Sequence, residues 1–142
     1  GGLNRFSSVK NGLSKVPEES IVAIHDGVRP LVSKKLIDTL IFGCKKGIGI
    51  VPVIPVKDSL RKVDGRKSKA VSRNSLYKVQ TPQCFFASTI ITAYKQNFSL
   101  FFTDDASVLE SNGGKIDTIK GEERNIKLTT QEDLNIAEAF MQ

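Results

Sequence analysis

An aspartate and an arginine follow a short apolar run in the sequence His25-Asp26-Gly27-Val28-Arg29-Pro30. The β-branched residues of 21–26 predict a buried strand that carries Asp26 to the solvent at its carboxyl end. A carboxylate in that place can hold Mg²⁺ together with phosphate oxygens, and the forked guanidinium of Arg29 suits phosphate. Gly27 would let a ligand approach the backbone closely. The alternative is an ordinary turn with a surface ion pair, and the pattern alone leaves the two readings equally open.

Other polar side chains stand at the predicted boundaries of later elements. Hydroxyl and amide groups at such boundaries commonly serve as caps or turns, so each one is weak evidence by itself. As a set they offer donors that could surround a polyanion, and phosphoryl or nucleotidyl transfer depends mainly on positioning and charge neutralisation. The set comprises Arg29, Arg73, Thr81, Thr103 and Lys127.

Several other chemistries find no support in the residue pattern. His25 is the single histidine, and it lies in an apolar strand, which favours a packed, hydrogen-bonded role over catalysis. No Ser/His/Asp or Cys/His arrangement is present, which disfavours acyl transfer. Cys44 and Cys84 lack zinc-site spacing and fit a reducing cytoplasm. The chain contains neither GxxxxGK[ST] nor GxGxxG, so a loop to cradle a triphosphate is missing from these residues.

Composition suits one compact domain with anionic partners. The chain has 142 residues, is 39% hydrophobic and carries a net charge of +6. No apolar run is long enough to span a membrane. The densest basic cluster surrounds Asp64-Gly65, a hairpin signal, and is most simply a solvated surface. Because residues 56–75 offer few core side chains, we expect a projecting arm of the kind that often meets a partner subunit.

Apolar spacing predicts helices alternating with strands, and therefore an α/β fold with a largely parallel sheet. We expect helix caps at Asn4, Ser33, Ser88 and Thr103. In the last helix, residues 131–141, Leu134, Ala137, Phe140 and Met141 are expected to face inward. The predicted strands are residues 21–26, 48–56, 59–63, 69–73, 115–119 and 125–128.

The boundary residues, taken in order, resemble the 2-C-methyl-D-erythritol 4-phosphate cytidylyltransferases of the non-mevalonate isoprenoid pathway. One matching block is weak, but this many in the correct order are specific, and they cover essentially the whole chain. The blocks are Gly1-Gly2 with Arg5 and Ser8-Val9; Val22-Ala-Ile-His-Asp26-Gly-Val-Arg29-Pro30; Pro55-Val-Lys-Asp58-Ser59; Val71-Ser-Arg73-Asn74 with Leu76; Gln80-Thr81-Pro82-Gln83; Thr103-Asp104-Asp105-Ala106-Ser107; Asn125-Ile126-Lys127-Leu128-Thr129; and Glu132-Asp133-Leu134.

The resemblance implies a Rossmann-like nucleotide-diphospho-sugar transferase fold with a projecting β-hairpin arm. It also implies that residues 1–142 form a single incomplete cytidylyltransferase domain. The family's N-terminal part carries a Gly-rich loop for the CTP triphosphate, and nothing in this sequence matches it. We therefore expect these residues by themselves to bind CTP poorly and not to catalyse. The implied activity of the whole protein is transfer of CMP from CTP to methylerythritol phosphate, with Mg²⁺ as cofactor and release of pyrophosphate.

The resemblance also assigns roles to single residues. Asp26 would serve CTP and the metal, and Lys127 would reach phosphate and stabilise the transition state. Thr103 and Arg29 would contact the sugar phosphate. The remaining assignments are Gly2, Ser8 and Gly27 to the nucleotide, and Ser59, Arg73 and Thr81 to methylerythritol phosphate across a homodimer interface made by the arm of residues 56–75.

Two alternatives stay open. A relative that uses ribitol 5-phosphate or another pentitol phosphate would share the CTP half of the site, so only the acceptor distinguishes it. A non-catalytic domain that dimerises or binds nucleic acid would also explain the net charge of +6. The ordered polar blocks favour an enzyme of small molecules, with neither a nucleic acid nor a membrane as partner and with a cytoplasmic location.

Overall fold

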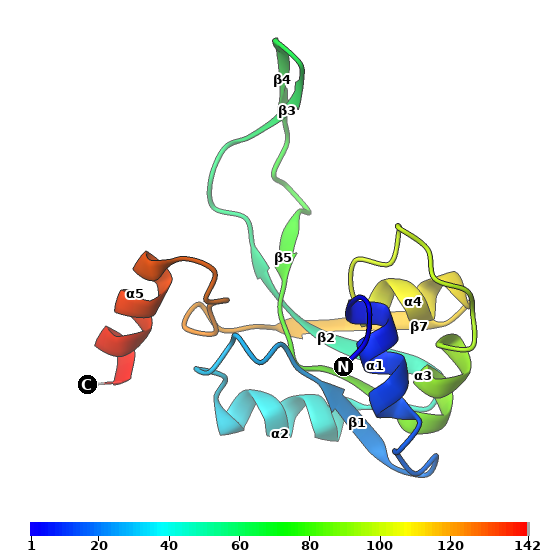
Figure 1. The fold of residues 1–142 in the computed structure, drawn as a ribbon. Coiled ribbons are helices and arrows are strands. Elements are labelled where there is room, and N and C mark those ends of the chain that lie inside the picture. The colour runs from blue at the N-terminus through cyan, green and yellow to red at the C-terminus, as the bar shows by residue number, and fades with distance from the viewer. Residues whose placement is uncertain (142) are drawn as a thin grey trace.

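A computed structural model describes residues 1–141 as one mixed sheet with helices on both faces and a separate two-stranded hairpin (Figure 1). Helices and strands alternate from α1 to β2 and from α4 to α5, as the apolar spacing predicts, but the five strands β2 to β6 follow one another without a helix. The elements are α1 (Arg5–Leu13), β1 (Ile21–Ile24), α2 (Lys34–Gly43), β2 (Ile48–Pro55), β3 (Leu60–Asp64), β4 (Lys67–Val71), β5 (Tyr77–Val79), β6 (Gln83–Phe86), α3 (Ala87–Ala93), α4 (Asp105–Ser111), β7 (Lys115–Lys120) and α5 (Gln131–Met141).

The main sheet is mixed, which corrects the expectation of a mostly parallel one. Strand β2 pairs with β7 in parallel, but it runs antiparallel to both β5 and β6, and β6 runs antiparallel to β1. The reason is that β5 and β6 return along β2 after the hairpin excursion, without a helical crossover. Strand β1 lies at one edge and its residues alternate between exposed and half-buried, so the prediction of a buried strand is wrong for these residues.

Two apolar cores lie on opposite faces of the sheet. Successive side chains of a strand point to opposite faces, and β6 therefore sends Phe85 to one core and Cys84 to the other. Phe85 packs among buried residues of α1, α3 and α4, whereas Cys84 packs against Leu36 and Leu40 of α2. Burial raises the pKa of the Cys84 thiol to about 12, so this thiol stays protonated and unreactive at neutral pH.

Phe85 offers a direct test of the larger core. It is fully buried, and replacing it with alanine is expected to lower the free energy of unfolding by about 3–5 kcal/mol, because a large cavity remains. Urea titration followed by circular dichroism measures the change. Phe101 is 87% exposed and is the matched control, since Phe101→Ala should shift stability by no more than about 0.5 kcal/mol. Equal losses in both variants would contradict the assigned core.

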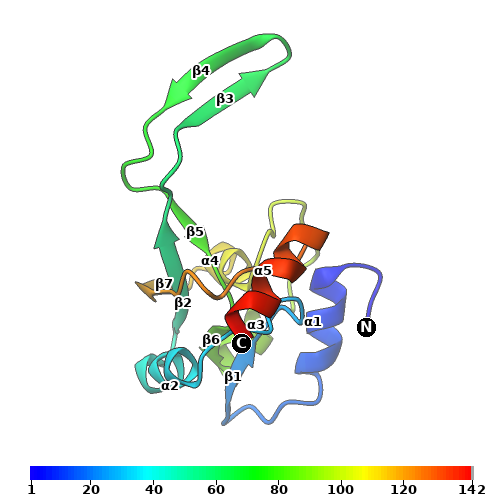
Figure 2. The same ribbon diagram turned by 90° about the vertical axis from the view of Figure 1, so that its left-hand side faces the viewer.

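The hairpin of β3 and β4 projects far from the sheet (Figures 1 and 2). Its strands pair in antiparallel register from Leu60↔Val71 to Asp64↔Lys67, and Gly65 adopts a positive φ in the turn, as the Asp64-Gly65 signal predicts. Nearly every hairpin residue is exposed. At its base the Lys57 ammonium lies 2.7 Å from Glu123, and Arg73 donates to the Lys57 carbonyl. The predicted projecting arm is thus present in the fold.

The helix caps are only partly as predicted. Asn4 and Ser33 accept hydrogen bonds from the first turns of α1 and α2, which confirms both caps. Helix α3 instead begins after Phe86, and α4 is capped by Asp104, whose carboxylate and Ser107 form a capping box. The expected caps at Ser88 and Thr103 are therefore wrong. The capping role of Asp104 leaves the Thr103 hydroxyl outside the helix.

The C-terminal segment from residue 125 onward departs furthest from expectation. Residues 125–128 form no strand, and α5 lies away from the sheet (Figure 1). Only Ala137 of α5 is buried, while Leu134, Phe140 and Met141 are largely exposed, so the predicted inner face is mostly wrong. Within the described part of the chain, no helix has the length and apolar character needed to cross a membrane.

Candidate functional site

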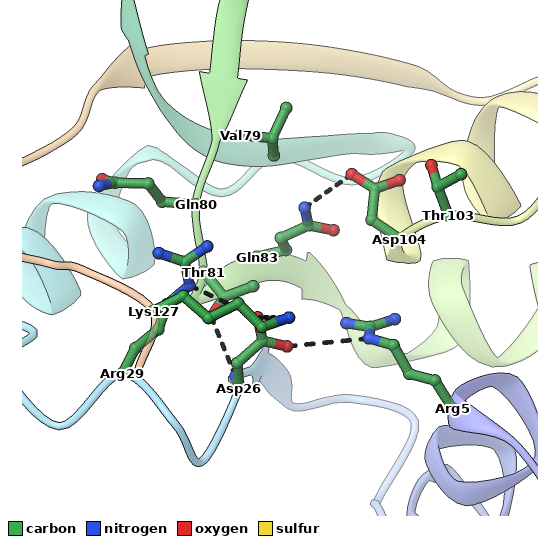
Figure 3. A pocket seen from close by; sticks show the side chains of 10 residues that line it. All are labelled: Arg5, Asp26, Arg29, Val79, Gln80, Thr81, Gln83, Thr103, Asp104 and Lys127. Carbon is green, nitrogen blue, oxygen red and sulfur yellow. Dashed lines mark hydrogen bonds and ion pairs between the residues drawn. The ribbon is translucent and has the colours of Figure 1, made fainter. Parts of the chain in front are cut away.

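A pocket of about 260 Å³ opens where β1 ends, between the turn after β1, the chain before β6 and the start of α4 (Figure 3). It brings together five of the ten predicted site residues: Asp26, Arg29, Thr81, Thr103 and Lys127. The other lining residues are Arg5, Val79, Gln80, Gln83 and Asp104.

The Asp26 carboxylate is surrounded by the cationic side chains of this pocket. Its side chain is 16% exposed, and three cations approach its carboxylate from different segments. Arg29 Nε and Lys127 Nζ each lie 3.4 Å from Oδ2, and Arg5 Nε lies 3.8 Å from Oδ1. These distances exceed the 2.7–2.9 Å typical of a tight charge-assisted bond. The three cations therefore keep hydrogen-bonding capacity for an anion that enters the pocket.

Strand pairing determines where Asp26 lies. The antiparallel register of β1 with β6 brings the end of β1 beside Thr81. The Asp26 backbone N–H donates to the Thr81 hydroxyl at 2.9 Å, and that hydroxyl also bonds His25 Nδ1 at 2.9 Å. The Arg29 carbonyl lies 3.0 Å from His25 Nε2. His25 is thus hydrogen-bonded within the turn, as predicted, but it is exposed and not packed. Thr81 lines the pocket of its own chain.

Backbone contacts hold Lys127 against the same turn. The Leu128 backbone N–H donates to the Val28 carbonyl at 2.8 Å, and Arg29 Nη1 donates to the Asn125 carbonyl at 2.8 Å. Lys127 lies between these two hydrogen-bonded residues on a segment without regular secondary structure. The two hydrogen bonds, and not the strand predicted for residues 125–128, place its ammonium group beside Asp26.

Buried amides form the floor beneath this segment. Gln80 Nε2 donates to the carbonyls of Glu122 and Asn125, and its Oε1 accepts from the Glu122 backbone N–H. Asn125 is fully buried and its Nδ2 donates to the Thr81 carbonyl at 2.8 Å. These bonds tie the strand side of the pocket to the segment that carries Lys127. Most buried side-chain amide atoms in proteins are bonded in this way. Asn125 Oδ1 is the exception among the described residues, since it is buried without a hydrogen-bond partner.

The opposite wall is built on the first turn of α4. The side chain of Gln83 is fully buried; its Nε2 donates to Asp104 Oδ2 at 2.9 Å, and its Oε1 accepts from the Ala106 backbone N–H. The same Asp104 carboxylate accepts from the Ser107 backbone N–H. Gln83 therefore fixes the beginning of α4 to β6. Thr103, which immediately precedes this helix start, is presented at the rim of the pocket (Figure 3).

Arg5 reaches the pocket from α1 and is held by Asp105. Burial lowers the pKa of the Arg5 guanidinium, but the hydrogen bonds and charge of Asp105 raise it by more, so the net pKa shift is upward. Tyr94 donates to the same carboxylate, and burial followed by the charge of Asp105 raises the pKa of its hydroxyl. Arg5 therefore stays cationic and Tyr94 stays neutral at physiological pH.

The remaining predicted residues lie outside the pocket. Gly2 packs onto the turn that enters α1, where an added Cβ would lie 2.6 Å from the Ser8 nitrogen, so close packing explains its residue type. Gly27 has open space around its Cα. Ser59 and Arg73 lie at the base of the arm, and neither they nor Ser8 line this pocket.

Sequence reasoning assigned no site role to Arg5, Gln80, Gln83 or Asp104. Arg5 and Asp104-Asp105 also belong to matching blocks, but the spacing along the chain does not indicate that Arg5 pairs with Asp105, 100 residues away. The two glutamines belong to the block Gln80-Thr81-Pro82-Gln83, and that block was the available signal. Their bonding partners lie 21 to 45 residues away, so only the tertiary structure shows what they support.

The pocket can bind a polyanion. Three cationic side chains line it against two carboxylates, and one of these, that of Asp104, is already engaged by Gln83 and the helix cap. Asp26 is the carboxylate that remains open to a ligand. No cluster of three or more His, Cys, Asp or Glu residues suited to a metal ion occurs within residues 1–141. The arrangement fits phosphate chemistry with at most one protein carboxylate for a cation.

Comparisons with known proteins agree with this chemistry. The IspD family, described as 2-C-methyl-D-erythritol 4-phosphate cytidylyltransferase, matches residues 1–142. Proteins of that name from Azobacteroides pseudotrichonymphae and Bacteroides fragilis are 51% and 45% identical to the chain. Each alignment covers 99% of this chain and 64% of the relative.

A solved structure of similar fold supports the same placement. The 2-C-methyl-D-erythritol 4-phosphate cytidylyltransferase of Thermus thermophilus superposes with a TM-score of 0.88 at 32% identity, over 99% of this chain and 70% of that one. Apart from the sheet direction corrected above, the expected fold class is thereby confirmed, and the chain spans about two thirds of the length of the proteins it matches. With a family match along its whole length and relatives up to 51% identical, this chain belongs to the IspD family of 2-C-methyl-D-erythritol 4-phosphate cytidylyltransferases.

Proposed function

We propose that the protein to which these residues belong transfers CMP from CTP to 2-C-methyl-D-erythritol 4-phosphate and releases pyrophosphate. The observation that carries this proposal is the Asp26 carboxylate at the end of β1, approached by Arg5, Arg29 and Lys127 within 3.8 Å. Such a cluster supplies what nucleotidyl transfer requires, namely charge neutralisation around phosphates and one carboxylate for a divalent cation. Family membership supports CTP and methylerythritol phosphate as the two substrates.

The donor set fits Mg²⁺ as a one-carboxylate site. Magnesium is commonly bound by one or two carboxylates together with substrate phosphates and water. Asp26 meets this description because its ion pairs are loose and phosphates can take over the neighbouring cations. Asp104 does not, since its two oxygens already accept bonds from Gln83 and Ser107. When bound, the ion would neutralise charge on the triphosphate.

The bond changes assign work to the remaining side chains. An acceptor phosphate oxygen forms a bond to the α-phosphorus, the bond from that phosphorus to the bridging oxygen breaks, and the electron pair leaves on pyrophosphate. The acceptor phosphate is largely dianionic at neutral pH, because its second pKa is about 6. No general base is therefore required. Lys127 and Arg29 neutralise the charge that develops on phosphate oxygens, and Thr103 orients the acceptor at the rim.

The arm would complete the acceptor site of a second copy. Ser59 and Arg73 lie outside their own pocket, and the exposed hairpin makes no core of its own. In a homodimer formed through residues 56–75, these two side chains would reach methylerythritol phosphate in the partner's pocket. Gly2, Ser8 and Gly27 would contact the nucleotide on the α1 side. The free thiols of Cys44 and Cys84 are compatible with a reducing cytoplasm as the place of this activity.

Turnover of the complete gene product tests the proposal. Incubation with CTP, Mg²⁺ and methylerythritol phosphate is expected to release one pyrophosphate per cytidylylated product, measured by a coupled pyrophosphate assay and by mass spectrometry. Ribitol 5-phosphate in place of methylerythritol phosphate is the matched control, and it should give a far lower kcat/KM. Preferential use of ribitol phosphate would overturn the acceptor assignment. Absence of CTP-dependent pyrophosphate release with either acceptor would overturn the activity.

A further inference from the structure

The carboxylate of Asp105 has no access to solvent. Both of its oxygens accept hydrogen bonds, from Arg5 of α1 and from Tyr94 at the end of α3. Arg5 of α1 donates from Nη1 to Oδ1 at 2.9 Å and from Nη2 to Oδ2 at 2.6 Å. The Tyr94 hydroxyl, at the end of α3, donates to Oδ1 at 2.5 Å. A buried charge is tolerated because these three donors compensate its desolvation.

This bonding fixes the orientation of the Arg5 guanidinium. A planar fork bound at both Nη atoms to one carboxylate cannot rotate without breaking two charge-assisted bonds. Its Nε edge is then directed at the pocket, 3.8 Å from Asp26 Oδ1 (Figure 3). The Arg5 side chain is 39% exposed and lines the pocket, so a ligand in the pocket would lie against it. Asp105 itself does not line the pocket.

We propose that Asp105 is a positioning residue, which acts through Arg5 by holding that guanidinium beside Asp26 for contact with substrate phosphate. The proposal rests on the function proposed above and adds Arg5 to its binding groups. It also links the two sides of the site, because the helix start that carries Asp105 closely follows Thr103 at the rim. The positions of Arg5 on one side of the pocket and of Thr103 on the other therefore both depend on Asp105.

The clamp can be observed without any enzymatic assay. Rotation within a guanidinium that is bound at both Nη atoms is slow, and ¹⁵N NMR of arginine-labelled protein should resolve two separate Nη signals for Arg5. In Asp105→Asn, which keeps the side-chain shape but removes the carboxylate, these signals are expected to merge. Arg5→Lys identifies the resonance by its disappearance. Unchanged, resolved Nη signals in Asp105→Asn would overturn the clamp, whatever the protein catalyses.

A double-mutant cycle tests whether the clamp serves the reaction. Asp105→Asn is expected to reduce kcat/KM by about 10- to 100-fold, since a displacement of about 1 Å in a site can cost 100-fold. Lysine cannot make the bidentate contact, so Asp105→Asn should reduce kcat/KM by less than about threefold in the Arg5→Lys background. A merely structural role would give the same factor in both backgrounds. Glu110→Gln, an exposed carboxylate on the same helix, is the matched control and should leave activity unchanged.

The outcomes separate this inference from the proposed function. If the wild-type protein turns over and the cycle is additive, the positioning role is wrong while the function stands. If the wild-type protein releases no pyrophosphate, the proposed function fails, and the NMR comparison still decides whether Asp105 orients Arg5. Thermal unfolding of every variant is followed by circular dichroism. A smaller amplitude of the unfolding transition identifies a loss of folded protein, which is then not counted as a loss of kcat/KM.

Discussion

In the complete gene product, replacing Asp26 with asparagine is expected to lower kcat for cytidylyl transfer by about 100- to 1000-fold, the range found when one preorganised charge-stabilising group is removed from an active site. The side chain keeps its size, and its backbone N–H still donates to the Thr81 hydroxyl. What disappears is the negative charge among Arg5, Arg29 and Lys127. The variant would therefore be folded and more cationic at the site.

That change of charge gives the Asp26 variant a distinctive signature. Without the carboxylate, the three cations face a phosphate with no internal competitor, so CTP binding measured in the absence of Mg²⁺ should be unchanged or tighter. Turnover should fall and lose much of its dependence on Mg²⁺ concentration. A general loss of structure would instead weaken CTP binding together with kcat. Isothermal calorimetry and steady-state kinetics on the same samples distinguish the two.

The matched control for Asp26 is Asp38→Asn. Asp38 also pairs with a cation, Lys34 at 2.6 Å, but this pair lies on the exposed face of α2. An exposed pair of this spacing contributes only about 0.3–0.5 kcal/mol, and its loss should leave kcat unchanged. If Asp26→Asn retained kcat within about threefold of wild type, the assignment of Asp26 to the metal and phosphate site would be wrong.

Replacing Lys127 with methionine should also reduce turnover strongly. Methionine keeps an unbranched apolar chain and removes the ammonium group, which lies 3.4 Å from Asp26. If Lys127 stabilises charge that develops on phosphate during transfer, kcat should fall by about 100- to 1000-fold, with a smaller change in the KM for CTP. Pyrophosphate release under saturating substrates measures kcat directly.

Two further variants make the Lys127 result interpretable. Lys127→Arg keeps the positive charge but changes its shape, so it should recover part of the lost activity and not all of it. Lys35→Met removes an exposed lysine of α2 that does not line the pocket, and it should have no effect on kcat. A rise in KM with unchanged kcat in Lys127→Met would show uniform binding of substrate and transition state, and would contradict the proposed role.

The order of chemical groups along the chain was predictable because it is local. A β-branched run ending in Asp26 predicts a strand with a carboxylate at its end, and the ordered blocks through Thr103 and Lys127 identify the family without a structure. Hairpin prediction succeeded for a similar reason, since Gly65 in the turn needs only its own backbone conformation. Local propensity and turn chemistry are properties of neighbouring residues, and the sequence states them directly.

Predictions that depended on distant partners were less successful. The sheet direction was wrong because the sequence does not state that β5 and β6 return beside β2. The prediction of a strand near Lys127 was wrong because single hydrogen bonds hold this segment in place of a strand ladder. They run from the Leu128 N–H to the Val28 carbonyl and from the Arg29 guanidinium to the Asn125 carbonyl. The cap at Thr103 was displaced by one residue because Asp104 forms the better capping box.

Residue order was thus enough to indicate the family, most of the helical and extended segments, the arm and the candidate residues for the chemistry. The folded chain was needed to show that Arg29, Thr81, Thr103 and Lys127 converge on the Asp26 pocket and that Ser59 and Arg73 do not. It was also needed to reveal Asp105, 100 residues from Arg5, as the group that orients this guanidinium. The physical reason is that periodicity records which residues are buried, whereas convergence depends on strand register and on hydrogen bonds between segments remote in the chain.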